Sequence, residues 1–362
     1  MIGYLCATPY HVIAATTLAS GKFKDEHNVL VIMDHFSIDE PLVKKIRALG
    51  IFNEVHLYKS NKKTKLNNFK RLVNAFFPPR IMRELAKKDF DRFFCFALNF
   101  IDITYLIKKI NKRSEKCEFA FADDGLGSYI NEGIYTPTPT SERILKLNGR
   151  LKLLKTVKKL YVYKPDFVIA NKEFELDKIP QTEDSVHALR RLVGALWPLD
   201  TDVDFDGKIL HFEQPYANDP GDKITKEEQA LIALIQNEME APSCIKMHPR
   251  SFGDAKWEHF DVIESKMPME AMLLQKDCRP CLMTTNFSTA SFASFLLDGI
   301  GASGVPTLLM VKLVDNKDLK LGELIEKFID NLNEKLEDRS VFIPSDKDEL
   351  IRIIEQIKNS PK

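Results

Sequence analysis

The stretch Cys117–Tyr129 reads Cys-Glu-Phe-Ala-Phe-Ala-Asp-Asp-Gly-Leu-Gly-Ser-Tyr. Its apolar run, Phe119 to Ala122, is typical of a buried parallel strand, and two carboxylates and a glycine follow it at once. The carboxyl end of such a strand borders the ligand crevice of an open α/β sheet, so we expect Asp123 and Asp124 to lie there. Two carboxylates at close range raise one pKa, which suits a general base or acid. The alternative is a turn in which one acid caps the next helix.

Length and composition bound the class of protein. A chain of 362 residues fits two domains, and 44% hydrophobic with 29% charged residues is typical of a globular protein. Lys+Arg and Asp+Glu number 52 each, so the net charge gives no reason to expect a nucleic-acid partner. Basic runs occur at Lys59–Lys65, Lys108–Lys116 and Lys146–Lys159. They are either solvated helix faces or surfaces for an anionic acceptor or membrane.

The cysteines and the first residues indicate a compartment. The six cysteines show no disulfide framework, which favours a reducing cytoplasm, and the pair Cys278 and Cys281 lacks the further ligands of a zinc site. Met1–Ala7 lacks the basic n-region of a signal peptide, and Thr8-Pro9 ends its apolar run. We therefore interpret it as a first strand and not as a signal peptide. No apolar run reaches about 18 residues, so we expect no transmembrane helix.

The first half alternates strands and helices, which predicts a mostly parallel, Rossmann-like sheet. The expected strands are Ile2–Ala7, Val29–Met33, Val55–Tyr58, Phe90–Ala97 and Glu118–Ala122. The expected helices are His11–Ala19, Pro41–Leu49, Asn67–Phe77 and Ile101–Ile110.

After Tyr129 the pattern is looser. We expect a surface loop over Ile130–Ser141, a basic helix over Glu142–Leu160 and a last strand at Phe167–Ala170. The domain junction is expected near the acidic segment Asp200–Asp206, which gives domains 1–200 and 201–362.

The second half restarts the alternation. The expected strands are Lys208–Phe212, Ser243–Met247, Cys281–Met283 and Pro306–Met310. The expected helices are Lys226–Met239, a helix from Ser288 onward, Leu321–Leu332 and Lys347–Lys358. The predicted fold is α/β, with two Rossmann-like domains of mostly parallel sheets facing a central cleft, the GT-B architecture of many glycosyltransferases.

Three strand ends of the second half carry polar residues that suit parts of a nucleotide. His248 follows one strand among Lys246, Pro249 and Arg250, and an imidazolium with charged donors stabilises a leaving phosphate. The hydroxyl cluster Ser288-Thr289-Ala290-Ser291 starts a predicted helix, where either an anion or simple N-capping explains it. Gln214-Pro215-Tyr216 follows a third strand and is a weaker candidate for contact with a base or ribose.

These motifs resemble the bacterial sialyltransferases. The set consists of Ala7-Thr8-Pro9-Tyr10-His11, Asp123-Asp124-Gly125, His248-Pro249 and the hydroxyl cluster after Thr285. It is most similar to the lipooligosaccharide and capsule sialyltransferases of glycosyltransferase family 52, with the polysialyltransferases as relatives. The resemblance spans most of the chain in order and spacing, although Thr289 stands where the family usually has a second serine.

The resemblance implies an inverting transfer of sialic acid from CMP-sialic acid to a galactose-type acceptor on a bacterial surface glycan. One of Asp123 and Asp124 is then the base, and His248 stabilises the departing phosphate. Donor-binding residues are Gln214, Pro215, Lys246, Pro249, Arg250, Ser288, Thr289 and Ser291, and acceptor-binding residues are Thr8, Pro9, Tyr10, His11 and Gly125. The donor has a single phosphate, so we expect no metal and no other cofactor.

Other interpretations remain open at this point. The same architecture serves transferases of other nucleotide sugars, and Asp123-Asp124 also suits a Mg²⁺ site in a phosphoacceptor module. A non-catalytic polysaccharide-assembly protein is the third alternative. We expect a cytoplasmic protein whose basic run Lys146–Lys159 lies against the inner membrane face, and the resemblance is compatible with a homodimer. The acceptor, the linkage and the number of residues added are not encoded in a readable motif.

Overall fold

The computed structural model describes two compact units, Met1–Pro198 and Leu199–Lys362. The residues described are 1–36, 38–59, 76–96, 100–113, 116–130, 135–169, 174–197, 204–214, 223–248, 257, 259–265, 267–275, 278–286, 288–297, 304–314, 322–336 and 340–360. The expected helix Asn67–Phe77 lies almost wholly outside these residues.

The first unit is built on a seven-stranded sheet in the order β3-β2-β1-β4-β5-β6-β7. Every neighbouring pair is parallel. The central strands are near-continuous apolar runs buried on both faces, as parallel strands require. The strands are β1 (Ile2–Cys6), β2 (Asn28–Met33), β3 (Glu54–Tyr58), β4 (Arg92–Cys95), β5 (Glu118–Ala122), β6 (Lys159–Val162) and β7 (Glu175–Lys178).

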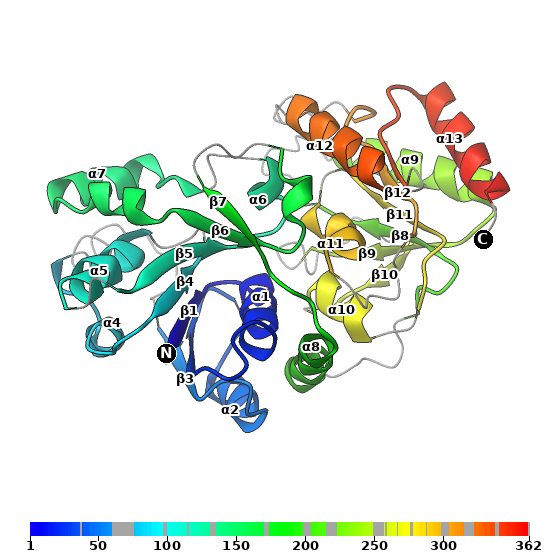
Figure 1. The fold of residues 1–362 in the computed structure, drawn as a ribbon. Helices are drawn as coiled ribbons and strands as arrows, with labels where there is room; N and C mark the ends of the chain where they lie inside the picture. The colour runs from blue at the N-terminus through cyan, green and yellow to red at the C-terminus, as the bar shows by residue number, and fades with distance from the viewer. Residues whose placement is uncertain are drawn as a thin grey trace. The chain divides into compact units, whose positions relative to one another are not determined.

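Helices cover both faces of this sheet, with α1, α2 and α8 on one side and α4, α5 and α7 on the other (Figure 1). The helix α1 is buried around most of its circumference because it lies between the sheet and α8. The helices are α1 (Pro9–Ser20), α2 (Glu40–Ala48), α4 (Arg80–Leu85), α5 (Phe100–Asn111), α6 (Gly127–Ile130), α7 (Pro139–Leu147) and α8 (Glu183–Leu196), with 3-10 turns η2 (Leu151–Thr156) and η3 (Pro165–Phe167).

The second unit has a six-stranded, wholly parallel sheet in the order β10-β9-β8-β11-β12-β13. Its strands are β8 (Ile209–Phe212), β9 (Ser243–Lys246), β10 (Asp261–Ile263), β11 (Leu282–Thr285), β12 (Thr307–Leu309) and β13 (Val341–Phe342). Its helices are α9 (Lys223–Met239), α10 (Met269–Gln275), α11 (Ala293–Leu296), α12 (Gly322–Lys335) and α13 (Lys347–Asn359), with the 3-10 turn η6 (Thr289–Phe292). The core between β8, β9, α9 and α13 is rich in isoleucine, including Ile209, Ile232 and Ile245.

Two Rossmann-like domains were therefore predicted correctly, but the segment after Tyr129 was not. The expected helix Glu142–Leu160 is three elements, the end of α7, the turn η2 and the start of β6. The expected loop Ile130–Ser141 ends earlier, because Thr138 caps α7 and Pro139 starts it. The expected strand Phe167–Ala170 is wrong as far as it is described, since Phe167 ends η3 and the last two strands are β6 and β7.

The strand order decides which chain segments meet. In the first unit the chain runs outward from β1 to β2 and β3, and then crosses back to β4 on the other side of β1. In the second unit it runs from β8 to β9 and β10, and then crosses back to β11 on the other side of β8. Ligands of open α/β sheets bind at such switch points, beyond the carboxyl ends of the strands. Within the described ranges, no helix is long and apolar enough to cross a membrane.

Candidate active site

The acid pair follows β5 directly, at the carboxyl end of the strand that the sequence predicted. Gly125 adopts a φ of 82°, a left-handed conformation that a side chain disfavours. Its N–H donates to Asp123 Oδ1 at 2.8 Å, so the chain turns sharply around the Asp123 carboxylate. This turn sends the two neighbouring acids into different surroundings.

Asp123 is fully enclosed, with a side chain that is 0% exposed. Besides Gly125, the hydroxyl of Tyr10 donates to Oδ1 at 3.2 Å. Oδ2 accepts from the hydroxyl of Tyr129 at 2.5 Å and from the N–H of Tyr163 at 3.2 Å. Burial raises the pKa of Asp123 to about 6, and these four donors hold it below the still higher value that burial alone would give. The carboxylate ties α1, α6 and the end of β6 to β5.

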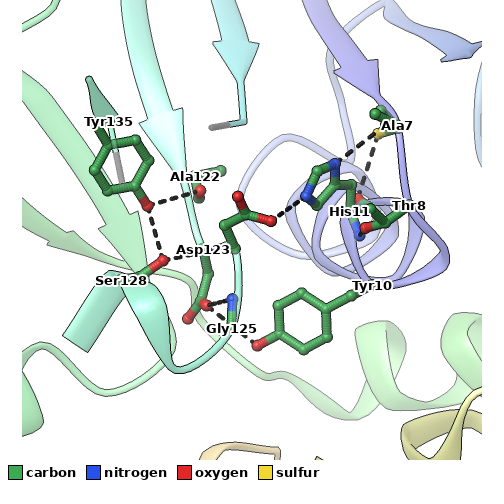
Figure 2. A network of polar contacts seen from close by, with 11 residues as sticks. Ala7, Thr8, Tyr10, His11, Ala122, Asp123, Gly125, Ser128 and Tyr135 are labelled. Carbon is green, nitrogen blue, oxygen red and sulfur yellow. Dashed lines mark hydrogen bonds and ion pairs between the residues drawn. The ribbon is translucent and has the colours of Figure 1, made fainter. Parts of the chain in front are cut away.

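Asp124 is more accessible, with a side chain that is 14% exposed. Its Oδ1 pairs with Nε2 of His11, which comes from the start of α1. Its own N–H donates to Oγ of Ser128 at 2.8 Å, and Ser128 in turn bonds the hydroxyl of Tyr135. Figure 2 shows the hydroxyl of Tyr135 reaching back to the carbonyl of Ala122, at 3.3 Å, so the turn is closed on itself.

The motif Thr8–His11 builds the facing side of this site. Thr8 caps α1, since its Oγ1 accepts from the N–H of His11 at 3.2 Å, and Pro9 occupies the first helical position. His11 is fully buried and stacks on Phe96, with ring centroids 4.1 Å apart. Thr8, Pro9 and Tyr10 are partly exposed beside the acids. Two side chains of this motif, Tyr10 and His11, contact the acid pair (Figure 2), and its expected contact with an acceptor stays a prediction.

In the second unit, two strand ends bring His248 and Lys246 beside an acid that the sequence analysis did not single out. Glu213 follows β8, and its Oε2 accepts from the N–H of His248 at 2.8 Å. Lys246 ends β9 and is buried, with Nζ donating to the carbonyls of Met247 at 3.1 Å and Ser265 at 2.6 Å. Burial lowers the pKa of Lys246 to about 8, against the field of Glu270 and Glu213.

The hydroxyl cluster follows β11, which pairs with β8. Ser288 caps η6, and its carbonyl accepts from the N–H of Ser291 at 3.2 Å and from the hydroxyl of Ser291 at 2.7 Å. Ser291 is buried and bonded to Ser288, so its hydroxyl serves the start of η6, as the N-capping alternative predicts for this cluster. Gln214 is partly exposed after Glu213. Pro215, Pro249 and Arg250 lie outside the described residues, and of Thr289 only the backbone is described.

Three further residues of these sites escaped the sequence analysis. Tyr129 is the last residue of the stretch Cys117–Tyr129, but nothing in the sequence indicates that a tyrosine six residues after Asp123 contacts it. Tyr163 follows β6, a strand that was not expected, so it had no predicted place at the sheet edge. Glu213 had a readable signal, because it is the first residue after a predicted strand, beside the strand that leads to His248.

The two sheet edges offer complementary chemistry. The first presents a pair of carboxylates after β5, one strand away from the switch point between β1 and β4. One carboxylate is enclosed and the other is accessible, and the hydroxyl of Tyr10 lies beside them. Such an arrangement can take a proton from a hydroxyl. The second presents an imidazole and a buried ammonium beside capped hydroxyls, which can hold an anion.

Comparisons with solved structures show the fold. The chain is similar to the UDP-GlcNAc 2-epimerase of Methanocaldococcus jannaschii (13% identity, TM-score 0.56, covering 99% of this chain and 93% of that one). It is also similar to the α/β-galactoside α-2,3-sialyltransferase of Photobacterium phosphoreum (12% identity, TM-score 0.53, 94% and 98%). A third similar structure is the UDP-N-acetylglucosamine 2-epimerase of Rickettsia bellii (9% identity, TM-score 0.54, covering 100% of this chain and 88% of that one). These neighbours have the GT-B fold, and at such identities they show the fold alone.

Sequence comparison identifies the family. None of the curated proteins matches the chain significantly. Residues 4–289, however, match the family described as alpha-2,8-polysialyltransferase (POLYST), a range that contains both the acid pair and His248. The match confirms the resemblance to bacterial sialyltransferases, and it selects the polysialyltransferases, which the motifs had suggested only as relatives. This chain, with its acid pair after β5 and its His248 after β9, belongs to the alpha-2,8-polysialyltransferase family.

Proposed function

We propose that this protein is an inverting, metal-independent sialyltransferase that moves sialic acid from CMP-sialic acid to a glycan on a bacterial surface. The observation that carries the proposal is the acid pair at the carboxyl end of β5, with one carboxylate accessible, in a chain of the polysialyltransferase family. An accessible carboxylate beside a bound sugar hydroxyl supplies the base that the reaction needs.

The donor is proposed to bind at the carboxyl edge of the second sheet. His248 is partly exposed there, and its backbone is fixed by Glu213. The departing CMP carries one phosphate, and an imidazole, the ammonium of Lys246 and the cap of η6 supply donors and positive charge for it without a divalent ion. Ser288, which caps η6, is favoured over the buried Ser291 for direct contact.

The acceptor is proposed to enter beside Thr8, Pro9 and Tyr10, which are partly exposed around the acid pair. The resemblance to lipooligosaccharide sialyltransferases implies a galactose-type acceptor. The family description names polysialyl transfer, which favours an acceptor that itself ends in sialic acid and an α-2,8 bond. These two acceptors differ in the hydroxyl that attacks, so a direct comparison of them decides the linkage.

The reaction is proposed to proceed in one step with inversion. The acceptor hydroxyl attacks the anomeric carbon of sialic acid while a carboxylate of the acid pair takes its proton. The bond between that carbon and the phosphate oxygen breaks, and its electron pair leaves with CMP. His248 donates to the departing phosphate.

Peripheral contact with an anionic membrane surface is a further part of the proposal. From Arg143 to Lys164 the chain has eight Lys or Arg residues and no Asp or Glu. Leu147 at the end of α7 is 74% exposed, and Lys152 and Lys155 of η2 are exposed nearby in the chain. Basic side chains around an exposed leucine suit anionic headgroups. Sedimentation with phosphatidylglycerol vesicles tests this contact, and a Lys152→Glu/Lys155→Glu variant that sediments like the wild type would contradict it.

The activity test measures CMP release from CMP-sialic acid with no acceptor, with a galactose-terminated acceptor and with a sialic-acid-terminated acceptor, in the presence of a chelator. Release that an acceptor stimulates and the chelator leaves intact is the expected result. A folded protein that neither releases nor binds CMP would contradict the proposed donor. Calorimetry with UDP- and GDP-sugars then finds the donor of an alternative transferase.

A further inference from the structure

The two carboxylates of the acid pair differ in the number of hydrogen bonds that their oxygens already accept and in their exposure. Asp123 accepts two hydrogen bonds on each oxygen and has no exposed surface. Asp124 accepts from His11 alone among the described residues, through Oδ1, and its side chain is 14% exposed. A hydroxyl can reach Oδ2 of Asp124 without displacing a hydrogen bond, whereas any partner of Asp123 would have to displace one.

His11 reaches Asp124 in a single tautomer. The N–H of Ala7 donates to Nδ1 of His11 at 3.1 Å, so Nδ1 is an acceptor and the ring proton is on Nε2. A second proton, on Nδ1, would point at the N–H of Ala7. His11 therefore stays neutral and donates to Oδ1 of Asp124 from Nε2.

The ring of His11 is also fixed in its orientation. It is fully buried and lies flat on Phe96, with an interplanar angle of 10°. Its backbone is held by the cap of α1, where Thr8 Oγ1 accepts its N–H, and by Cys6, whose thiol donates to its carbonyl at 3.3 Å. A fixed donor on one oxygen sets the plane of the carboxylate and the direction in which its other oxygen points.

We propose that Asp124, and not Asp123, is the general base, and that His11 is its positioning residue, a neutral imidazole that orients the Asp124 carboxylate. The proposal rests on the proposed sialyl transfer. In the reaction step the O–H bond of the acceptor breaks and its proton goes to Oδ2 of Asp124, while the acceptor oxygen bonds to the anomeric carbon and CMP leaves with the electron pair. His11 takes no proton, because neither of its ring nitrogens is available for one.

Asp123 then has a positioning role of its own. It holds Tyr10 at the start of α1 and Tyr129 in α6, on the two sides of the Asp124 turn. Among the residues that the structure describes, the titratable groups beside Asp124 are His11 on α1, Asp123 before it in the chain and Tyr135 after α6. Of these, His11 is the group that donates to its carboxylate.

The experiment compares Asp124→Asn with Asp123→Asn, and His11→Phe with His11→Gln. Phenylalanine keeps the ring that stacks on Phe96 but removes the Nε2–H donor, whereas the glutamine amide replaces that donor. We expect Asp124→Asn to lower kcat about a hundredfold to ten-thousandfold, as loss of a general base does. His11→Phe loses a hydrogen bond to a charged group, so we expect kcat to fall about tenfold to a hundredfold with an unchanged donor KM. In His11→Gln we expect kcat to recover most of this loss, because the amide replaces the donor.

Rescue by glutamine separates positioning from a general loss of structure. His11→Gln can donate to Oδ1 of Asp124 and should recover kcat, whereas a merely structural role of the ring would leave His11→Phe, which keeps the stack on Phe96, the more active of the two variants. Full activity of Asp124→Asn, or an unchanged kcat in His11→Phe, overturns the proposal. If His11→Phe does not fold, Asp124→Asn decides alone, with CMP binding as the check of its fold.

The controls keep this inference apart from the proposed function. A wild-type protein that transfers from a different nucleotide sugar contradicts the proposed donor, and the same four variants are then assayed with that sugar. A wild type that uses CMP-sialic acid, together with a folded Asp123→Asn that is inactive and an Asp124→Asn that is active, supports the proposed function and overturns the assignment of the base.

Discussion

At the carboxyl edge of its sheet, each unit contains a buried ionisable group whose pKa is shifted by burial, and the two shifts have opposite signs. Burial raises the pKa of Asp123 in the first unit to about 6 and lowers the pKa of Lys246 in the second to about 8. Both groups therefore remain mostly charged at neutral pH. Four hydrogen-bond donors surround the acid, while two carbonyls and the field of two glutamates serve the lysine.

The two sheet edges are built on one plan. In both units the buried charge lies within two positions of a more accessible residue, Asp124 after Asp123 and His248 after Lys246. The buried member fixes the local backbone and the accessible one faces outward. We therefore expect substitutions of the accessible member to affect chemistry and substitutions of the buried member to affect stability.

The largest effect is expected at the accessible member of the second pair. His248→Ala removes the proposed donor to the departing phosphate, so kcat for sialyl transfer should fall about a hundredfold to ten-thousandfold. Steady-state kinetics with CMP-sialic acid measure it. His259 is exposed in the same unit and serves as a matched control, His259→Ala, which should keep the wild-type kcat. Equal kinetics in the two variants would remove His248 from the mechanism.

The buried member of the first pair should affect stability. Asp123→Ala leaves the hydroxyl of Tyr129 and the N–H groups of Gly125 and Tyr163 without their acceptor, which should cost roughly 3 kcal/mol of unfolding free energy. Each unit contains one of the two tryptophans, Trp197 and Trp257. Urea titration in a Trp257→Phe background therefore follows the first unit through Trp197. A loss below about 0.5 kcal/mol would mean that these donors find other partners.

The stability of the first unit should also depend on pH through Asp123. Its folded pKa, about 6, is above the ordinary value of 3.8, so the folded state binds more protons between these values. The stabilisation is complete below the ordinary pKa and is lost as the pH rises through 6. From pH 4 to pH 7 the wild type should lose about 2 kcal/mol more than Asp123→Asn, which cannot titrate there. Parallel pH curves for the two proteins would contradict the raised pKa.

Lys246 should show the opposite dependence. Its folded pKa, about 8, is below the ordinary 10.5, so the unfolded state binds more protons between these values and stability rises with pH across this window. Between pH 8 and pH 10 the wild type should gain about 2 kcal/mol relative to Lys246→Met. Urea titrations followed by Trp257 fluorescence in a Trp197→Phe background measure this change in the unfolding free energy of the second unit. A constant difference between the two proteins over this range would show that the lysine titrates as if exposed.

Much of this architecture could be predicted, because buried parallel strands leave clear apolar runs. The strands around Ile2–Cys6, Asn28–Met33, Glu118–Ala122 and Ile209–Phe212 were expected within one residue or so of their bounds. Strand β7 (Glu175–Lys178) was missed because an edge strand with no buried residue has no such run. Strand β6 was missed because Lys158 and Lys159 continue the basic pattern of the preceding helix.

The site was predictable to the level of strand ends and no further. An acid pair after an apolar strand predicts a place at the crevice, and the structure has Asp123 and Asp124 there. The pairing of His11 with Asp124 was not predicted, because the two residues are 113 apart and meet only through the order β1-β4-β5. Strand order depends on packing between distant segments, which local patterns do not contain. For the same reason, the different surroundings of the two acids were not predicted.

The smallest effect concerns the turn that carries Asp124. The hydroxyl of Tyr135 bonds Ser128 at 2.8 Å and donates to the carbonyl of Ala122 at 3.3 Å, and Ser128 accepts the N–H of Asp124. Tyr135→Phe keeps the buried ring but removes the hydroxyl, so the first unit should lose about 1 kcal/mol of unfolding free energy. Because Ser128 still accepts from Asp124, kcat should change less than in His11→Phe. A larger fall in kcat than in His11→Phe would show that the backbone of the turn, more than the imidazole, orients the carboxylate of Asp124.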